Sequence, residues 1–279
     1  MKTGKFHTPK FLLTLIFIFL CRPAFSLSVS YEQAFTLTPL NEGLELGFGT
    51  LLSGSALVCD KFVHLKKNNY NAADWSFTDV PDLDALFARP YSKPLHIAGT
   101  ATAALTLMAP AVFVVLPQSE WLTVGTMYVE TLLFANGIKE WLKLIVYRAR
   151  PYMYFDGYPQ DKLNDGDWNC SFPSGHSTLA FAGAAFTTML FCQYFPDSKW
   201  KYAVAGASFG VAALTGALRM ASGNHFFTDV LAGAFIGTLC GIAVPYMHTK
   251  GFYDNHSKNK RSVNASVMPY GINLSFYLE

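Results

Sequence analysis

Residues 230–249 read VLAGAFIGTLCGIAVPYMHT and contain no Asp, Glu, Lys or Arg. A helix of about 20 predominantly apolar residues is long enough to cross the hydrocarbon core of a bilayer. Other tracts without these charged residues are 94–119, 168–196 and 202–218. A further apolar tract, 121–138, is interrupted only by Glu130. This pattern predicts several membrane-spanning helices rather than the core of a soluble domain.

The composition of the whole chain supports a membrane protein. Lys and Arg number 21 and Asp and Glu 19, so charged residues are 14% of the 279 residues, whereas a soluble globular domain carries roughly 25%. An apolar content of 51% and an aromatic content of 15% exclude an intrinsically disordered chain. The net charge of +2 gives no broad basic field, so we expect no nucleic-acid partner.

The tracts predict an all-α, polytopic helical bundle of five or six transmembrane helices. The five predicted spans have the approximate limits 95–117, 121–145, 177–195, 200–218 and 229–247. Gly and Ala are common in the last three, and such small residues let helices approach closely in lipid. Residues 44–63 are apolar but carry Glu45, Asp60 and Lys61, which fits either a sixth span or a helix lying on the membrane surface.

The regions outside the spans complete the predicted organisation. Lysines precede an apolar stretch at 11–20, and Ala24-Phe25-Ser26 offers a small-residue cleavage site, so residues 1–26 are predicted to be a signal peptide or an uncleaved anchor. Residues 27–94 form an N-terminal region with a polar loop, and 95–247 form the transmembrane domain. Residues 248–279 form a polar tail, in which 270–278 fit a short strand or an unstructured end.

Polar residues that could take part in catalysis or binding occur at three places, each at the end of a predicted span. The first is KLIVYRARP at 143–151. Lys143 and Arg150 are seven residues apart, close to two helical turns, so they share nearly one face if the helix continues that far. The plain alternative is a positively charged membrane anchor. Arg148 and Lys139 are interpreted as loop or headgroup contacts.

The second place is SFPSGHS at 171–177, where a turn leads into an apolar helix. Gly175 permits unusual backbone torsions, and the exposed N–H groups of a helix start bind anions. Ser174 adds a hydroxyl group. His176 can donate a proton to a leaving oxygen near neutral pH. The alternative is an ordinary capping turn with an incidental histidine.

The third place is RMASGNHFFTD at 219–229. His225 and Asp229 are four residues apart, which predicts one helix face and a hydrogen bond that orients the imidazole. Arg219 offers a fork of donors suited to phosphate oxygens. The alternative is an ion pair between Arg219 and Asp229. Because successive spans alternate in direction, all three places are expected at one membrane face, where they would surround a space for an anion.

These three stretches resemble the motifs of the type 2 phosphatidic acid phosphatases (PAP2), a family related to vanadium haloperoxidases and glucose-6-phosphatase. The first motif, Lys followed after six residues by Arg-Pro, matches 143–151, and Pro-Ser-Gly-His matches 173–176. The third motif, Ser-Arg, then His, then Asp, matches 219–229 except that Leu218 replaces the Ser. The resemblance covers roughly residues 95–247 and implies a PAP2/haloperoxidase-like core.

The resemblance also implies roles for the residues. His225 would attack phosphorus to form a phosphohistidine, Asp229 would hold its ring, and His176 would protonate the leaving alcohol. The phosphoryl oxygens would be bound by Lys143, Arg150, Ser174, Gly175 and Arg219. No metal and no cofactor are expected, since cations take the place of a magnesium ion and the sequence spacing reveals no metal-ligand cluster.

The membrane setting predicts a lipid phosphate monoester or pyrophosphate as the substrate, because a site at the interface can meet a headgroup whose chains stay in the bilayer. A signal-like N-terminus before a compact core favours a lipid of the bacterial envelope and a multi-pass inner-membrane protein. Basic residues in the tail favour a cytoplasmic C-terminus and an outward-facing site. A cleaved signal peptide agrees with this orientation if residues 44–63 do not cross the membrane and conflicts with it if they do. The alternative function is binding of an anionic lipid or phosphate without turnover. The sequence does not indicate an oligomeric state.

Overall fold

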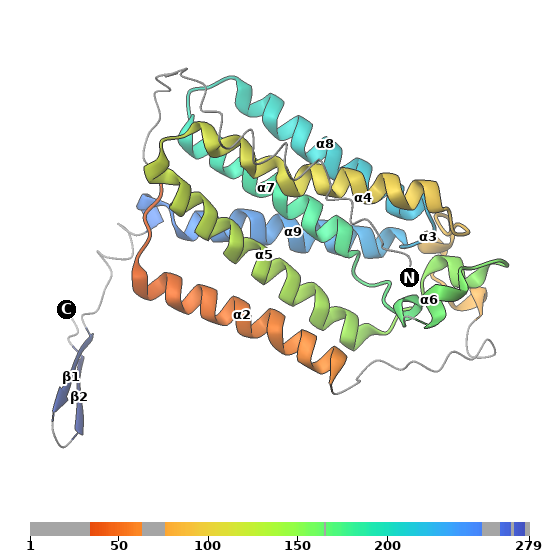
Figure 1. Ribbon diagram of the computed structural model, residues 1–279, viewed down its shortest axis with the longest axis horizontal. Helices are drawn as coiled ribbons and strands as arrows, with labels where there is room; N and C mark the ends of the chain where they lie inside the picture. Colours follow the sequence, from red (N-terminus) through yellow and green to blue (C-terminus); the bar gives the residue numbers. More distant parts are fainter. Residues whose placement is uncertain (1–33, 63–75, 165, 253–262, 269–270, 277–279) are drawn as a thin grey trace, which may run out of the picture. The chain divides into compact units, whose positions relative to one another are not determined.

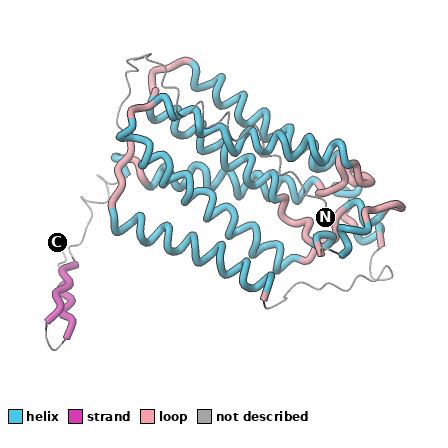
Figure 2. The backbone as a smooth tube through the Cα atoms, in the orientation of Figure 1, coloured by secondary structure: helices cyan, strands magenta, loops and turns pink. Residues whose placement is uncertain are grey.

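The computed structural model describes residues 34–62, 76–164, 166–252, 263–268 and 271–276. Helices make up most of this part of the chain (Figures 1 and 2). The α-helices are α2 (Pro39–Lys61), α3 (Asp82–Ala85), α4 (Lys93–Met108), α5 (Gln118–Val146), α6 (Gln160–Asn164), α7 (Gly175–Tyr194), α8 (Trp200–Ala221) and α9 (Phe227–Met247). The 3₁₀ segments are η2 (Phe77–Asp79), η3 (Ala109–Val115), η4 (Pro151–Tyr154) and η5 (Asp167–Asn169).

The prediction of a helical membrane bundle is confirmed. Each of the five predicted spans is helical, the first through α4 and the η3 turn that continues it. By length and composition, three segments of the described residues are apolar enough to cross a membrane: Lys93–Val115, Trp200–Ala221 and Phe227–Met247. Helix α5 is more polar, and both α5 and α7 bring charged or polar groups to the ends where the motifs lie.

Helix α7 is central to the bundle and packs against α4, α5, α8 and α9. Its interface with α9 is made of small residues, as the sequence predicts. At this interface a Cβ atom on Gly237 of α9 would lie only 2.1 Å from the backbone oxygen of Thr178. At the contact of α7 with α4, a Cβ atom on Gly183 would lie only 2.2 Å from the backbone oxygen of Thr106. The backbones therefore approach so closely that only glycine fits at these positions.

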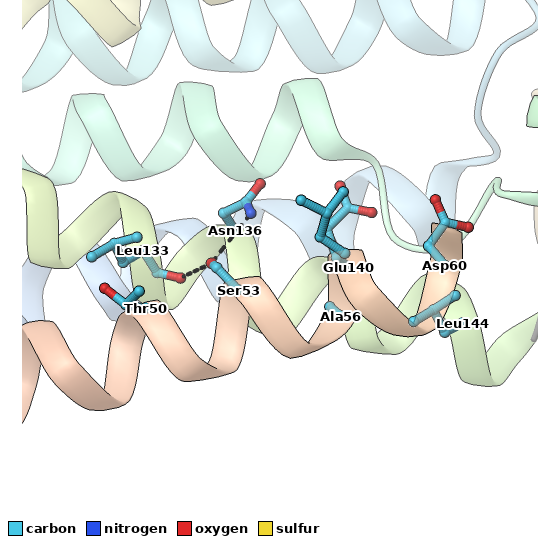
Figure 3. A pocket seen from close by; sticks show the side chains of 10 residues that line it. Thr50, Ser53, Ala56, Asp60, Leu133, Asn136, Glu140 and Leu144 are labelled. Carbon is cyan, nitrogen blue, oxygen red and sulfur yellow. Dashed lines mark hydrogen bonds between the residues drawn. The ribbon is translucent and has the colours of Figure 1, made fainter. Parts of the chain in front are cut away.

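Helix α2 begins five residues before the predicted apolar segment 44–63 and lies along α5 (Figure 1). Ser53 donates a hydrogen bond to the Leu133 carbonyl oxygen (2.8 Å), and Asn136 Nδ2 donates one to Ser53 Oγ (3.3 Å; Figure 3). Trp141 Nε1 donates to the Leu52 carbonyl oxygen (3.1 Å). These bonds flank a groove of about 460 Å³ between the two helices. Polar contacts thus attach α2 to the bundle.

The two ends of the chain differ in what the structure describes. The signal peptide predicted for residues 1–26 lies outside the described residues. In the tail, the strand predicted near 270–278 is β2 (Gly271–Phe276), which pairs antiparallel with β1 (Val263–Met268). Val263 lies opposite Phe276 and Met268 opposite Gly271. The tail therefore adds a β-hairpin to an otherwise helical chain, and its first strand was not predicted.

Candidate active site

The three motif regions meet at one end of the bundle. The C-terminal ends of α5 and α8 and the N-terminal ends of α4, α7 and α9 all lie there, with α3 and α6 beside them (Figure 1). Hydrogen bonds join segments far apart in sequence: Arg150 contacts His225, and the Ser174 amide donates to the Asp229 carbonyl oxygen at 3.0 Å. The alternating direction of the spans thus brings the predicted residues to a common site.

His225 lies at the centre of this site and is 2% exposed. Its Nδ1 is 2.7 Å from the carbonyl oxygen of Ser171, and its Nε2 is 3.0 Å from Nη1 of Arg150. A carbonyl oxygen only accepts hydrogen bonds, so Nδ1 carries the proton and Nε2 keeps its lone pair. Burial, and then the charges of Arg150, Arg219 and Lys143, hold the pKa of His225 well below its ordinary value. The imidazole is therefore neutral at pH 7.

The predicted hydrogen bond between His225 and Asp229 is absent from the described structure. Nδ1 of His225 is 3.9 Å from Oδ2 of Asp229, because His225 lies in the loop before α9 and not on its face. Oδ2 of Asp229 instead accepts hydrogen bonds from the Phe226 amide (2.8 Å) and from Ser171 Oγ (2.5 Å). Asp229 therefore acts on His225 through Ser171, the residue whose carbonyl oxygen orients the ring.

Arg148 is not the loop or headgroup contact that the sequence suggested. Its Nη1 donates to Oδ1 of Asp229 and its Nη2 to Oδ2 of Asp84, both at 2.6 Å. Asp84 is fully buried and also accepts from the amide of Thr228 at 2.9 Å. Burial opposes its ionisation, but hydrogen bonds from Arg148 and Thr228 outweigh this and lower the pKa of Asp84. The guanidinium thus connects the N-terminal region to the start of α9.

Arg150 does not share a helix face with Lys143, contrary to the prediction. Helix α5 ends at Val146, and Tyr147 adopts a left-handed conformation (φ 46°, ψ 57°) that turns the chain away. Arg150 then donates to the backbone oxygen of Asp167 (2.8 Å) and to its Oδ1 (2.7 Å). Burial opposes the charge of Asp167, but Arg150 outweighs it and lowers the pKa of Asp167 to about 2. This ion pair fixes the guanidinium beside His225.

The start of α7 lies next to two lysine side chains of α5. A Cβ atom on Gly175 would lie 3.5 Å from Nζ of Lys143 and 3.5 Å from Cδ of Lys139. Lys143 Nζ is 3.6 Å from Oε1 of Glu140, which also pairs with Lys139. The first amides of a helix and nearby ammonium groups both attract anions. Lys139, which the sequence reading placed at the headgroups, thus lies beside Gly175.

Ser174 caps α7 and is fully buried. Its Oγ accepts hydrogen bonds from the amide (3.4 Å) and the hydroxyl (2.9 Å) of Ser177. Two residues after Ser174, Nε2 of His176 lies 3.1 Å from Oγ1 of Thr100. Ser174 therefore shapes the helix start, while the imidazole of His176 is held against α4.

Arg219 is the last of the predicted site residues, and it is only 2% exposed. Its Nη1 is 3.0 Å from Nδ1 of His96, a residue of α4 that the sequence reading did not select. Its Nε has no hydrogen-bond acceptor among the described residues. A buried guanidinium N–H without an acceptor is costly in the absence of a ligand, and an anionic oxygen is the group that would satisfy it.

The sequence gives little indication of three polar residues that the structure shows in contact with the arginines of the site. Asp84, Asp167 and His96 contact Arg148, Arg150 and Arg219, respectively. Each lies in a loop or at a helix start far from its partner along the chain, so no fixed spacing connects them. In the sequence these three residues share one feature, which is that each is a polar residue next to an apolar tract.

Residues 125–253 match the family model described as the PAP2 superfamily. A lipid A 1-phosphatase of Porphyromonas gingivalis is 37% identical over 110 residues, which are 37% of this chain and 23% of that protein. A PA-phosphatase related-family protein of Dictyostelium discoideum is 32% identical over 101 residues, 34% of this chain and 37% of that protein. The chain thus spans well under half the length of these curated relatives.

Two crystal structures of bacterial phosphatases are also similar. LpxE of Aquifex aeolicus has a TM-score of 0.43 and 21% identity. The match covers 61% of this chain and 98% of the LpxE chain. A transmembrane PAP2 type phosphatidylglycerolphosphate phosphatase of Bacillus subtilis has a TM-score of 0.38 and 20% identity, covering 77% and 96%. The residues matched by the family model include all three motifs, and the resemblance of this chain to the PAP2 superfamily is thereby confirmed.

Proposed function

We propose that the protein is a membrane lipid phosphatase that hydrolyses a lipid phosphate monoester or pyrophosphate through a phosphohistidine, without a metal ion. One observation carries the proposal: Nε2 of a neutral, buried His225 lies 3.0 Å from Nη1 of Arg150. A histidine nucleophile needs an unprotonated ring nitrogen, and here that nitrogen lies beside a guanidinium group suited to binding phosphoryl oxygens. The hydrogen bond from Nδ1 to Ser171 fixes this tautomer.

The proposed reaction has two steps. Nε2 of His225 attacks phosphorus, so that a P–N bond forms and the P–O bond to the lipid breaks. His176, which takes up a proton when the anionic phosphate binds, gives that proton to the leaving oxygen. Water then gives a proton to His176 and attacks the phosphorus of the phosphohistidine, and inorganic phosphate leaves as the P–N bond breaks. Arg150, Arg219 and Lys143 stabilise the negative charge on the phosphoryl oxygens in both transition states.

The proposed substrate is a lipid of the bacterial envelope. The site lies at the ends of helices that are apolar enough to cross a membrane, so it can meet a headgroup at the interface. Phosphatidic acid, phosphatidylglycerol phosphate, polyprenyl pyrophosphate and lipid A phosphate all meet this description. The similarity to a lipid A 1-phosphatase makes lipid A phosphate the first candidate. We place the protein in the bacterial inner membrane with its site on the periplasmic face.

A panel of these lipids, incubated with the purified protein in detergent, tests the proposal. We expect phosphate release from at least one lipid in the presence of a chelator, and inhibition by vanadate, which imitates five-coordinate phosphorus. His225→Ala should lower the rate on the order of 10⁴-fold or more, whereas His256→Ala, a substitution in the polar tail, should leave it unchanged. Phosphate or lipid binding by the wild type without release of phosphate would favour the non-catalytic alternative.

A further inference from the structure

A second cluster of ionisable side chains lies at the other end of the bundle from the candidate active site. It consists of Glu42, Glu45, Glu130 and His248, here called the Glu/His cluster. Glu42 and Glu45 are near the start of α2, Glu130 lies within α5, and His248 follows α9. His248 is 19 residues after Asp229, about 28 Å along a helix. The cluster is therefore separate from the phosphate-binding residues.

One ring nitrogen of His248, Nε2, faces the carboxylates. Its Nδ1 is 2.8 Å from the carbonyl oxygen of Val244, so Nδ1 donates and Nε2 points away from the helix. Nε2 lies 3.1 Å from Oε2 of Glu42, 3.4 Å from Oε2 of Glu130 and 4.0 Å from Oε2 of Glu45. A hydrogen bond from the second ring nitrogen to a backbone carbonyl is the usual support of a metal-bound histidine.

The carboxylates are buried and poorly satisfied. Glu130 and His248 are fully buried. Neither oxygen of Glu130, nor Oε2 of Glu45, has a hydrogen-bond donor in the described part of the chain. If all three carboxylates are ionised, the cluster keeps a negative charge even when the imidazole is protonated, and uncompensated charge is costly inside a protein. The unpartnered side chain of Glu130 thus calls for a positively charged ligand.

The distances suit a small divalent ion. Metal bonds of about 2.0–2.1 Å separate neighbouring ligand atoms by roughly 3.0 Å in an octahedron and 3.4 Å in a tetrahedron. The spacings of Nε2 from Glu42 and Glu130, 3.1 and 3.4 Å, fall in this range. An imidazole nitrogen among the ligands favours zinc, iron, copper or nickel over magnesium, calcium or manganese.

We propose that the Glu/His cluster binds one divalent transition-metal ion, with Glu42, Glu130 and His248 as ligands and Glu45 as a further carboxylate. The ion would cross-link α2, α5 and the end of α9. The segment before α2 closes the same region: the Thr36 amide donates to the His248 carbonyl oxygen (2.9 Å), and the Thr38 amide donates to Oε1 of Glu42 (3.1 Å). The side chains of Glu42 and Glu45 are 11% and 20% exposed, which leaves a route for the ion to enter.

Metal content and thermal stability test this site independently of phosphatase activity. The full chain, purified in detergent and stripped with a chelator, is dialysed against zinc chloride, and bound zinc is measured by mass spectrometry. We expect about one zinc ion per chain and a rise of several degrees in the melting temperature on loading, since an ion that binds only the folded state stabilises it. Cobalt loading should give a visible ligand-field spectrum.

Matched variants assign the ion to the cluster. Glu130→Gln and His248→Gln should lose the bound zinc and the rise in melting temperature. Glu120→Gln removes another buried glutamate of α5, one that accepts a hydrogen bond from the Tyr194 hydroxyl (2.8 Å), and should keep both. A stripped wild type that takes up no zinc, or Glu130→Gln that binds as much zinc as the wild type, would overturn the proposal. The first result would mean that the carboxylates are neutralised by protons.

Discussion

At the scale of single residues, the site depends on one tautomer of His225. The sequence spacing selected His225 and Asp229 but assigned a direct hydrogen bond between them, as if both lay on one helix. In the structure the Ser171 carbonyl oxygen fixes the ring, and Asp229 binds Ser171 Oγ. Spacing along a chain identifies residue types in a motif, but it does not reveal which backbone group from another segment lies between them.

The role of His176 leads to a prediction at this scale. If His176 protonates the leaving oxygen, His176→Ala should lower the rate with an alkyl lipid phosphate by about 10²–10⁴-fold. An aryl phosphate with an acidic leaving group needs little protonation, so the same variant should lose far less rate with p-nitrophenyl phosphate. Rates for both substrates, measured with wild type and variant, check this. An equal loss with both would indicate a role in binding rather than proton transfer.

At the scale of the elements, the limits of α5 and the contact of α7 with α9 determine the geometry. The left-handed Tyr147 ends α5 before Arg148, which removes Arg148 and Arg150 from the helix surface and lets them bind Asp84 and Asp167. The apolar tract predicted a span that ends at residue 145, within one residue of the end of α5, but it did not predict the left-handed turn, because no Gly or Pro marks position 147. The glycine-rich sequence of α9, by contrast, did predict close helix packing.

That packing can be tested by adding a methyl group. Gly237→Ala would place Cβ 2.1 Å from the backbone oxygen of Thr178, so α7 and α9 must move apart, at a cost of about 1–3 kcal/mol. Gly206→Ala in α8 meets no atom within 4 Å and should be neutral or stabilising by up to about 1 kcal/mol. Thermal unfolding in detergent compares them. Equal stability of the two variants would contradict the close contact.

At the scale of the whole molecule, the positions of the charged residues along the sequence predicted more of the structure than their number did. Apolar tracts predicted the helical bundle, and their alternating direction predicted that the motifs meet at one end. The sequence could not predict Asp84, Asp167 or His96, nor the Glu/His cluster, because each depends on side chains from separate helices. Glu130, for example, interrupted an apolar tract without any sign that Glu42 and His248 lie beside it.

The orientation of the bundle gives a prediction of its own. Asp161 in α6 and Asp197 between α7 and α8 are both exposed, and they belong to opposite ends of α7. In a chain without native cysteines, a membrane-impermeant thiol reagent should label Asp161→Cys in intact spheroplasts, and should label Asp197→Cys only after lysis. This follows from the basic tail, which favours a cytoplasmic C-terminus. The reverse labelling pattern would place the site in the cytoplasm.

The central claim is that His225 carries the phosphoryl group. It is tested most directly by mixing the purified protein with lipid ³²P-phosphate in excess chelator, quenching in alkali within milliseconds, and locating the label by mass spectrometry. A phosphohistidine survives alkali and is lost in acid. The proposal predicts an alkali-stable, acid-labile phosphate on His225 that is absent from His225→Ala. Rapid phosphate release by wild-type protein with no label on His225, or release that survives in His225→Ala, would contradict it.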